Sequence, residues 1–299
     1  MPAQSPAAVA VLGTGIMGAP MARRMSEAGL SVSAWNRTRE KAEALSACGV
    51  RVADSPAAAA QGARLVVTML SDADAVLSAI ERAGGAQGEP DDRPATWLQM
   101  STVGVRGIER CAEAAQALGL ELVDAPVLGT RQPAEEGKLT VLASGAAQAL
   151  ERAAPVFDAV AARTVRLGEV GQGTRLKLVL NQWVLAVMEG VAETIALAEA
   201  LEMDPRLFLE VIGGGPLDAP YAQTKAKTIL DDRFDQASFG LSMARKDARL
   251  VAQAAHDAGA SAPLAELIEE QMGKAVEAGH GDEDMAATYW ATARRPAHA

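Results

Sequence analysis

Aromatic residues are scarce in this sequence. Phe, Trp and Tyr together make up 3% of the 299 residues, whereas 49% of all residues are hydrophobic. The interior therefore has to be built mainly from Ala, Leu and Val side chains. The length allows one large domain or two medium domains with cores of ordinary size.

The sequence is also poor in residues that form disulfides or bind metals. Its two cysteines, Cys48 and Cys111, lie in separate segments with no histidine or cysteine at ligand spacing. Its three histidines, His256, His280 and His298, are scattered late in the chain, and we expect them at the surface. We therefore expect no disulfide framework and no metal site, and a reducing cytoplasm fits this composition.

Long hydrophobic runs and an excess of basic charge are missing as well. No apolar stretch reaches the roughly twenty residues that span a bilayer, and residues 1–6 are too few and too polar for a signal peptide. The formal net charge of −10 at pH 7 argues against nonspecific nucleic-acid binding. We expect a cytoplasmic protein that acts on a small molecule, with neither a nucleic acid nor a membrane as its partner.

What the sequence does contain is a glycine turn between an apolar run at 9–12 and an amphipathic helical stretch at 19–28. The turn consists of Gly13, Thr14, Gly15, Ile16, Met17 and Gly18. In a strand–turn–helix unit the first glycine permits a tight turn, the second lets a pyrophosphate approach the backbone, and the third lets helix and strand pack closely. The context favours a dinucleotide site, which the helix N-terminus would complete, over a purely structural turn.

The end of the next predicted strand, at 30–35, indicates which dinucleotide binds. An acidic residue usually stands near this strand end when NAD is the cofactor, because it holds the ribose 2′-hydroxyl. Here the sequence has instead Asn36, Arg37, Thr38 and Arg39. Guanidinium groups bind a phosphate in a fork geometry, so we predict NADP(H). The alternative is that both arginines are solvated surface charges.

Short apolar runs alternate with helical stretches through the first half of the chain. Strands are predicted at 65–70, 96–100, 121–125, 139–144 and 164–167, with helices that include 39–47 and 105–118. This alternation predicts an α/β domain over 1–168 with a doubly wound, mainly parallel sheet. The segment 84–94, rich in Gly, Asp and Pro, is the most disorder-prone loop.

Strand signals stop after Gly168, and an all-α domain is predicted over 169–299. Helices are expected at 174–201, from Asp204-Pro205 to Gly213, and at 219–230, 240–258, 263–278 and 283–292. The first of them is long and apolar around most of its circumference, so a small helical domain can hardly cover it alone. We therefore expect self-association.

Two polar residues near the start of that long helix are candidates for chemistry. Lys177 and Asn181 are four residues apart and share one helix face, among apolar neighbours. A lysine in apolar surroundings has its pKa lowered toward the range useful for proton transfer. The alternative is a lysine whose stem is buried and whose ammonium group reaches solvent.

Five segments in this order resemble the β-hydroxyacid dehydrogenase family, which includes 3-hydroxyisobutyrate, tartronate-semialdehyde and glyoxylate/succinic-semialdehyde reductases. They are the 13–18 glycine turn, Ser101-Thr102, Asp124-Ala125-Pro126-Val127, the block from Gly171 and Gly173 to Lys177 and Asn181, and Lys246-Asp247. The resemblance covers almost the whole chain. It implies a Rossmann domain followed by an all-α domain, and usually dimers or tetramers.

The resemblance also implies roles for individual residues. Lys177 would be the catalytic acid or base, and Asn181 a substrate ligand. Thr102 would lie beside the nicotinamide, while Leu70, Ser71 and Lys246 would contact the cofactor. The reaction would transfer a hydride between NADP(H) and a small hydroxy acid, semialdehyde or 2-oxo acid.

One departure from the family pattern falls where substrate specificity is decided. After Asp124-Ala125-Pro126-Val127 the family usually has Ser-Gly-Gly, which holds the substrate carboxylate, whereas this chain has Leu128-Gly129-Thr130. Leucine cannot donate a hydrogen bond, so Thr130 or Arg131 would have to replace the serine, or the substrate is less polar. With Asn181, the predicted substrate contacts are Thr102, Gly129, Thr130 and Phe239. The following segment, 131–137, resembles the glyoxylate/succinic-semialdehyde branch most.

Two alternatives stay open at this point. An imine reductase shares the implied architecture, and Leu128 favours it mildly, although such enzymes commonly have Asp or Tyr in place of Lys177. An NADP-binding sensor or scaffold without activity is the non-enzymatic alternative, and the presence of both Lys177 and Asn181 argues against it. A 6-phosphogluconate dehydrogenase fits less well, because that family has a longer helical region.

Overall fold

The computed structural model describes residues 7–84 and 95–293. Most of the loop predicted at 84–94, the segment 1–6 and His298 therefore lie outside the described residues. The chain forms two compact units, Met1–Lys177 and Leu178–Ala299. The division falls inside the long helix, whose first turn is hydrogen-bonded to the first unit.

A six-stranded sheet forms the centre of the first unit, and all its neighbouring strands are parallel. In spatial order the strands are β3 (Arg51–Val52), β2 (Ser31–Trp35), β1 (Ala8–Leu12), β4 (Leu65–Thr68), β5 (Thr96–Gln99) and β6 (Glu121–Asp124). Every residue of β4 and β5 is buried, as expected for parallel strands that are covered on both faces. The predicted doubly wound α/β fold is confirmed.

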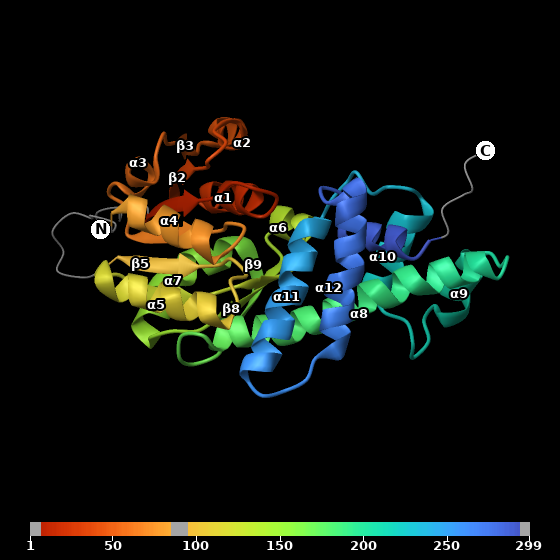
Figure 1. The fold of residues 1–299 in the computed structure, drawn as a ribbon. Helices are drawn as coiled ribbons and strands as arrows, with labels where there is room; N and C mark the ends of the chain where they lie inside the picture. The colour runs from red at the N-terminus through yellow and green to blue at the C-terminus, as the bar shows by residue number, and fades with distance from the viewer. Residues whose placement is uncertain (1–6, 85–94, 294–299) are drawn as a thin grey trace. The chain divides into compact units, whose positions relative to one another are not determined.

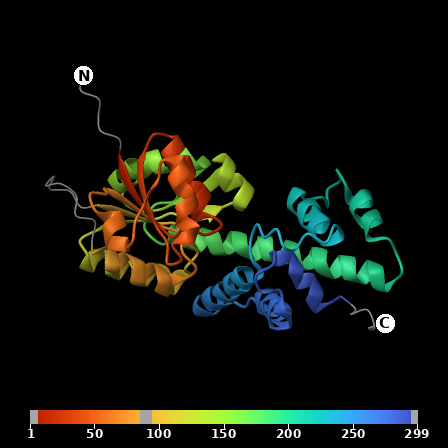
Figure 2. The same ribbon diagram turned by 90° about the horizontal axis from the view of Figure 1, so that it is seen from above.

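Helices cover both faces of this sheet (Figures 1 and 2). On one face, α1 (Gly18–Glu27) and α7 (Ala147–Val160) bury Met21, Met25 and Phe157 against the strands. On the other face, α3 (Pro56–Ala60), α4 (Ala73–Ala83) and α5 (Val105–Ala117) pack around Trp97. The predicted helix at 39–47 is a short α2 (Glu40–Glu43) that continues as a 3₁₀ turn, η1 (Ala44–Cys48).

The later strands of this unit differ from the prediction. They form a separate three-stranded sheet in which β7 (Val127–Leu128) is antiparallel to β8 (Leu139–Ala143), while β9 (Ala161–Arg166) is parallel to β8. An isolated bridge between Asp124 and Ser144 connects β6 to this sheet. Strand periodicity in the sequence does not reveal the sheet to which a strand belongs. The two-residue strands β3 and β7 are also too short to give a periodic signal.

The second unit is helical. It contains α8 (Gln172–Ala200) from Leu178 onward, then α9 (Pro205–Ile212), α10 (Pro220–Leu230), α11 (Leu241–Asp257), α12 (Pro263–Ala275), a π-turn η2 (Val276–His280) and a 3₁₀ helix η3 (Met285–Ala291). Asp204 caps α9 by accepting a hydrogen bond from the Arg206 backbone N–H, as its position before a proline predicts. In the described part of the chain, no helix has both the length and the apolar character needed to cross a bilayer.

The core of the helical unit is built on one face of α8. Leu185, Met188, Ala192 and Ile195 recur at helical spacing and are buried together with residues of α10, α11, α12 and η3. Beside this core lies a buried ion pair. The Lys225 Nζ donates to Asp284 Oδ1 at 2.5 Å and to Ser238 Oγ at 3.1 Å, while the Ser238 backbone N–H donates to Asp284 Oδ2.

Asp284 is thereby surrounded by donors. Burial alone would raise the pKa of this carboxyl, but the Lys225 ammonium and the backbone N–H groups of Ala286 and Ser238 lower it below its ordinary value. The ion pair ties α10 to the N-terminus of η3, and the hydrogen bonds of Ser238 connect it to the segment that precedes α11. Removal of either partner would leave an uncompensated buried charge.

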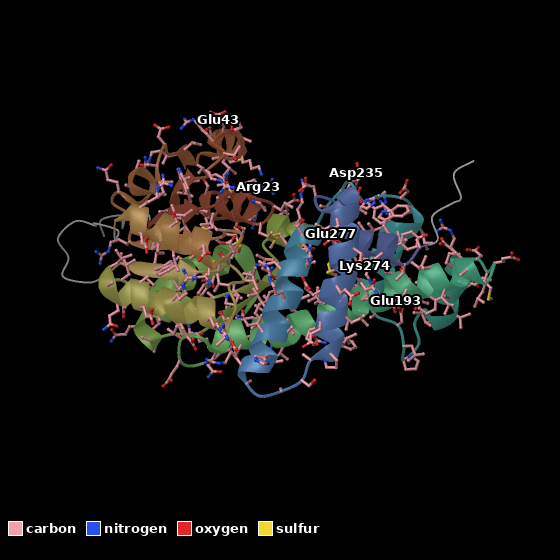
Figure 3. All side chains as sticks on the ribbon, in the orientation of Figure 1. Arg23, Glu43, Glu193, Asp235, Lys274 and Glu277 are labelled. Carbon is pink, nitrogen blue, oxygen red and sulfur yellow. The ribbon has the colours of Figure 1, made fainter. Side chains whose placement is uncertain are left out.

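A second buried carboxyl, that of Glu189 on α8, has fewer hydrogen-bond donors around it. The Thr288 hydroxyl donates to its Oε2 at 2.7 Å, while its Oε1 has no hydrogen-bond partner among the described residues. Burial raises the pKa of Glu189 from its ordinary value of 4.5 to about 7; the neighbouring Glu193 also raises it, and Lys274 lowers it. Glu193 is on α8 and Lys274 on α12 (Figure 3).

Glu189 therefore makes folding depend on pH. The folded protein retains a proton that the unfolded chain loses between about pH 4.5 and pH 7, so stability falls as pH rises through this window, by up to about 3 kcal/mol. Urea unfolding of Glu189→Gln and of the parent protein, at pH 5 and pH 8, measures this effect. We expect the substitution to stabilise the protein more at pH 8 than at pH 5. If the two proteins differed in free energy of unfolding by the same amount at both pH values, Glu189 would be ionised in the folded state.

Candidate active site

The glycine turn has the shape that a dinucleotide requires. Gly13 follows β1 with a φ of +105°, and a Cβ there would lie 2.2 Å from the Met69 carbonyl oxygen. At Gly18 a Cβ would lie 2.0 Å from the Gly13 carbonyl oxygen, where α1 begins. At Gly15, by contrast, a Cβ would meet nothing within 4 Å, so the backbone is open to close approach. The first and third glycines close the turn, and the second leaves room for a phosphate.

An unsatisfied hydroxyl lies within the same turn. Thr14 is only 2% exposed, and its Oγ1 has no hydrogen-bond partner among the described residues. Buried polar groups are rarely left unpaired, so a hydroxyl of this kind indicates a missing acceptor or donor. Ile16 is exposed and Met17 half-buried at the start of α1. The open Gly15 and the unsatisfied Thr14 together fit a bound pyrophosphate.

The side chain of Asn36 fixes the turn to the end of β2. Its Oδ1 accepts a hydrogen bond from the Thr14 backbone N–H at 3.0 Å, and its Nδ2 donates to the Thr38 carbonyl oxygen at 2.9 Å. The Gly13 backbone N–H donates to the carbonyl oxygen of Trp35, the last residue of β2. Asn36 therefore holds the glycine turn and the residues after β2 together.

The two arginines after β2 are in different environments. Arg39 forms ion pairs with Glu43 and Asp54, which occupy its guanidinium group. Arg37 is exposed, and the structure records no ion pair for it within the described ranges. Of the two predicted phosphate ligands, Arg37 is thus the one whose charge is not already balanced by a neighbouring carboxylate.

The ends of β4 and β5 lie at the same sheet edge as the glycine turn, because parallel strands present their carboxyl ends at one edge. Leu70 is half-buried here, and its backbone N–H donates to Ser101 Oγ at 2.9 Å, while Ser101 Oγ in turn donates to the Thr68 carbonyl oxygen. Ser71 is exposed and Thr102 is half-buried beside these residues in sequence. The buried Ser101 was not predicted as a site residue; its sequence signals were its place at a strand end and its place in the Ser101-Thr102 segment of the family resemblance.

The predicted substrate turn follows β7. Gly129 has a φ of +128°, and a Cβ there would lie 2.7 Å from Leu139 Cδ2, so glycine is required. Leu128 and Thr130 are half-buried. Arg131, a proposed replacement for the family serine, begins α6 (Arg131–Glu136) and pairs with Glu135 at 2.8 Å. Thr130 is therefore the better candidate of the two for hydrogen bonding to a substrate.

Lys177 belongs to the first unit and is half-buried. It lies one turn after the start of α8, whose first turn is bonded to Asp124 at the carboxyl end of β6. The glycine turn follows the carboxyl end of β1 in the same parallel sheet. The start of α8 and the glycine turn thus both lie at the carboxyl edge of the parallel sheet, although they are far apart in sequence.

The other predicted residues belong to the second unit. The buried Asn181 donates from Nδ2 to Asp247 Oδ2 at 2.7 Å, and Lys246 Nζ lies 2.9 Å from Asp247 Oδ1. Asp247 therefore fixes the orientation of the Asn181 amide, a role that the sequence did not reveal. Phe239 is half-buried, and its carbonyl oxygen accepts a hydrogen bond from the Met285 backbone N–H.

No three His, Cys, Asp or Glu residues of the described ranges are grouped so that they could hold a metal ion. His256 is exposed, as predicted. His280 is instead half-buried, with its Nδ1 3.0 Å from Glu283 Oε2 and its ring stacked on Trp290. Tertiary contacts with a neighbouring aromatic ring explain this difference. Cys111 is buried, and burial raises the pKa of its thiol to about 12, so it is not a nucleophile at neutral pH.

Comparison with known proteins identifies the family. Residues 8–168 match the family model of the NAD binding domain of 6-phosphogluconate dehydrogenase, and residues 171–291 match that of NADP-dependent 3-hydroxyisobutyrate dehydrogenase. The chain is 33% identical over 281 residues to glyoxylate/succinic semialdehyde reductase 2, chloroplastic, of Arabidopsis thaliana, covering 93% of this chain and 77% of that protein.

Solved structures have the same fold. A 3-hydroxyisobutyrate dehydrogenase from Salmonella typhimurium has a TM-score of 0.84 at 26% identity, covering 94% of this chain and 98% of the other. An imine reductase from Pseudomonas sp. has a TM-score of 0.62 at 23% identity, covering 96% and 99%, which shows a shared fold alone. The resemblance found in the sequence motifs is confirmed. With its two family models in order and its Rossmann-type sheet followed by helices, the chain belongs to the β-hydroxyacid dehydrogenase family of NAD(P)-dependent oxidoreductases.

Proposed function

We propose that this protein is an NADP(H)-dependent reductase of small carbonyl compounds that carry a carboxylate, such as semialdehydes and 2-oxo acids. The observation that carries the proposal is the location of Lys177 in the first unit, on a helix anchored at the same sheet edge as the open glycine turn. An ammonium group at that edge can serve as the proton donor of a carbonyl reduction. The reverse reaction oxidises the corresponding hydroxy acid.

The choice of NADP(H) rests on Arg37. No acidic side chain stands at 36–39 to repel a 2′-phosphate, and Arg37 has a guanidinium group that no described carboxylate neutralises. The turn from Gly13 to Gly18 would hold the pyrophosphate, and Leu70, Ser71, Thr102 and Lys246 are the further proposed contacts of the cofactor. When bound, the reduced nicotinamide supplies the hydride.

The residues of this chain would transfer the proton and bind the substrate. Lys177 donates a proton to the carbonyl oxygen as negative charge develops on it, which combines general acid catalysis with electrostatic stabilisation. Asn181 and Phe239 are proposed substrate ligands, as are Gly129 and Thr130. In the oxidative direction Lys177 accepts the hydroxyl proton, by microscopic reversibility.

One observation favours a second candidate activity. Leu128 offers no hydrogen bond where the family usually has a serine, which would suit a less polar substrate such as a cyclic imine. Lys177 argues against this alternative, because imine reductases commonly have Asp or Tyr at that position. The remaining alternative is an NADP-binding scaffold without activity. No feature of the described residues favours it.

The decisive assay follows oxidation of NADPH, with NADH in parallel, against succinic semialdehyde, glyoxylate, methylglyoxal and a cyclic imine. Rapid loss of NADPH with the two carboxylated aldehydes supports the proposal and indicates that Thr130 compensates for Leu128. Turnover of methylglyoxal or the imine alone would reject a carboxylate-binding pocket. Binding of NADPH without turnover of any of them would favour the scaffold.

We also propose that the protein is a homodimer or homotetramer and is located in the cytoplasm. Large apolar side chains of the helical unit are exposed in the single chain: Trp183, Leu197, Leu201, Met203, Val211 and Leu217. Exposed apolar surface of this extent is typical of protein–protein contacts. Light scattering during size-exclusion chromatography distinguishes the two assemblies from a monomer.

A further inference from the structure

We propose that Asp124 is a positioning residue for Lys177: its buried carboxylate fixes the first turn of α8 to the carboxyl end of β6. The inference rests on the proposed function, because it assigns Lys177 the proton transfer. Asp124 itself is fully buried, so it has no access to a substrate. Its effect on the reaction would pass entirely through the helix that it holds.

The contacts of Asp124 converge on that helix start. Its Oδ2 accepts hydrogen bonds from the backbone N–H groups of Gly171 at 3.1 Å and Thr174 at 2.8 Å, and its Oδ1 accepts one from the Thr174 hydroxyl at 2.7 Å. The Ser144 hydroxyl lies 3.2 Å from Oδ2, and it accepts a hydrogen bond from the Gly173 backbone N–H at 3.0 Å. One carboxylate and one hydroxyl thus satisfy three backbone donors at the beginning of α8.

These donors need partners because the first N–H groups of any α-helix have none within the helix. When such a group is buried and unsatisfied, the cost is about 1–3 kcal/mol. A negative charge at a helix N-terminus is also favourable to the helix dipole. Burial raises the pKa of Asp124, while the hydrogen bonds from Thr174, Ser144 and Gly171 oppose that rise.

Close packing makes this anchor, the attachment of the first turn of α8 to Asp124, rigid. A Cβ on Gly173 would lie 2.3 Å from the Leu142 carbonyl oxygen and 2.9 Å from the Asp124 carbonyl oxygen. The backbone of α8 therefore rests directly on β8 and on the end of β6. Lys177 is three residues beyond Thr174, which is about 4.5 Å along a helix axis. A shift of the first turn would consequently move the lysine by a similar amount.

Small displacements of a catalytic group lower the turnover rate strongly. A displacement of about 1 Å in a reacting group can cost about 100-fold in rate. Each hydrogen bond lost at the helix start allows part of such a displacement. The cofactor loop, at the other end of the first unit's chain, has its own hydrogen bonds through Asn36 and Ser101 and would not be altered.

Three substitutions separate geometry from charge. Asp124→Ala removes the anchor, and Thr174→Val removes the bond to Oδ1 with little change in shape. Asp124→Asn retains the geometry, because its carbonyl oxygen can replace Oδ2 while its amide donates to the Thr174 hydroxyl. Ser26→Ala is the matched control, since it removes a hydroxyl bond to the Cys48 carbonyl oxygen in the same unit but away from α8.

The measurements are kcat, KM, the Kd for NADPH, and hydrogen exchange of the backbone amides at 171–177. We expect kcat to fall about 100-fold in Asp124→Ala and about 10-fold in Thr174→Val, with unchanged NADPH affinity and faster exchange at the helix start. Asp124→Asn should retain most of the wild-type kcat, and Ser26→Ala all of it.

Other results would overturn the proposal. Wild-type kcat in Asp124→Ala, or in Thr174→Val if the alanine variant does not fold, would show that Lys177 needs no such anchor. An equal loss in Asp124→Asn and Asp124→Ala would assign the effect to charge instead of position. If the wild-type protein reduces none of the carbonyl compounds, the proposed function fails by itself. The exchange rates then still decide the anchor, since unchanged protection at 171–177 in Thr174→Val rejects it.

Discussion

Replacement of Lys177 by alanine is expected to lower kcat for carbonyl reduction by about 100- to 10,000-fold, the range typical of a lost general acid. NADPH binding should be retained, because the glycine turn, Asn36 and Ser101 form their own hydrogen-bonded structure without the lysine. The Kd for NADPH from fluorescence titration and kcat from steady-state kinetics measure the two effects separately.

Two further variants make this experiment specific. Lys138→Ala removes an exposed lysine of the same unit that pairs with Glu136, and it should leave kcat unchanged. Lys177→Arg keeps a positive charge but has no proton to give near neutral pH, so it tests proton donation rather than charge. If Lys177→Ala turned over substrate like the parent protein, the proposed mechanism would be rejected. If the parent protein were inactive as well, the scaffold alternative would gain support.

Replacement of Arg37 is expected to change the coenzyme preference. A charge-assisted hydrogen bond contributes about 1.5–3 kcal/mol, so Arg37→Ala should lower kcat/KM for NADPH by about 10- to 100-fold. The value for NADH should change little, because NADH has no 2′-phosphate. The ratio of the two kcat/KM values, measured with one carbonyl substrate, reports this effect free of general damage to the enzyme.

Arg39→Ala provides the matched comparison. It removes an equal charge two residues away, but from a guanidinium group already paired with Glu43 and Asp54. We therefore expect a much smaller change in the ratio. Equal losses of kcat/KM for NADPH in both variants would mean that binding of the 2′-phosphate depends on the summed local charge. If Arg37→Ala left the NADPH-to-NADH ratio of kcat/KM unchanged, the result would argue for NAD(H) as the cofactor.

Local patterns were sufficient to predict the elements that bear the site. Glycines spaced at 13, 15 and 18 between an apolar run and a helical stretch are typical of one local structure, a strand–turn–helix unit, and the structure contains this unit. The long helix was also evident, because its apolar residues recur with helical period over many turns. Its first turn starts at Gln172, close to the predicted Thr174.

Partners from distant segments could not be predicted in the same way. The pairing of Arg39 with Asp54, the hydrogen bond from Asn181 to Asp247 and the role of Ser101 each depend on side chains that meet only after folding. The same holds for β8 and β9, whose sequences have strand character but contain no information on which sheet they join.

The sequence by itself determined the α/β and all-α halves, the glycine turn and the candidate lysine, because these depend on short-range periodicity and on residue chemistry. The tertiary structure decided where the helix that bears Lys177 begins and how it is held. Asp124 and Thr174 are fifty residues apart in the chain, and only the packing of α8 against β6 and β8 brings the carboxylate to the helix start. Long-range hydrogen bonds of this kind have no periodic signature, so no local reading of the chain could have found them.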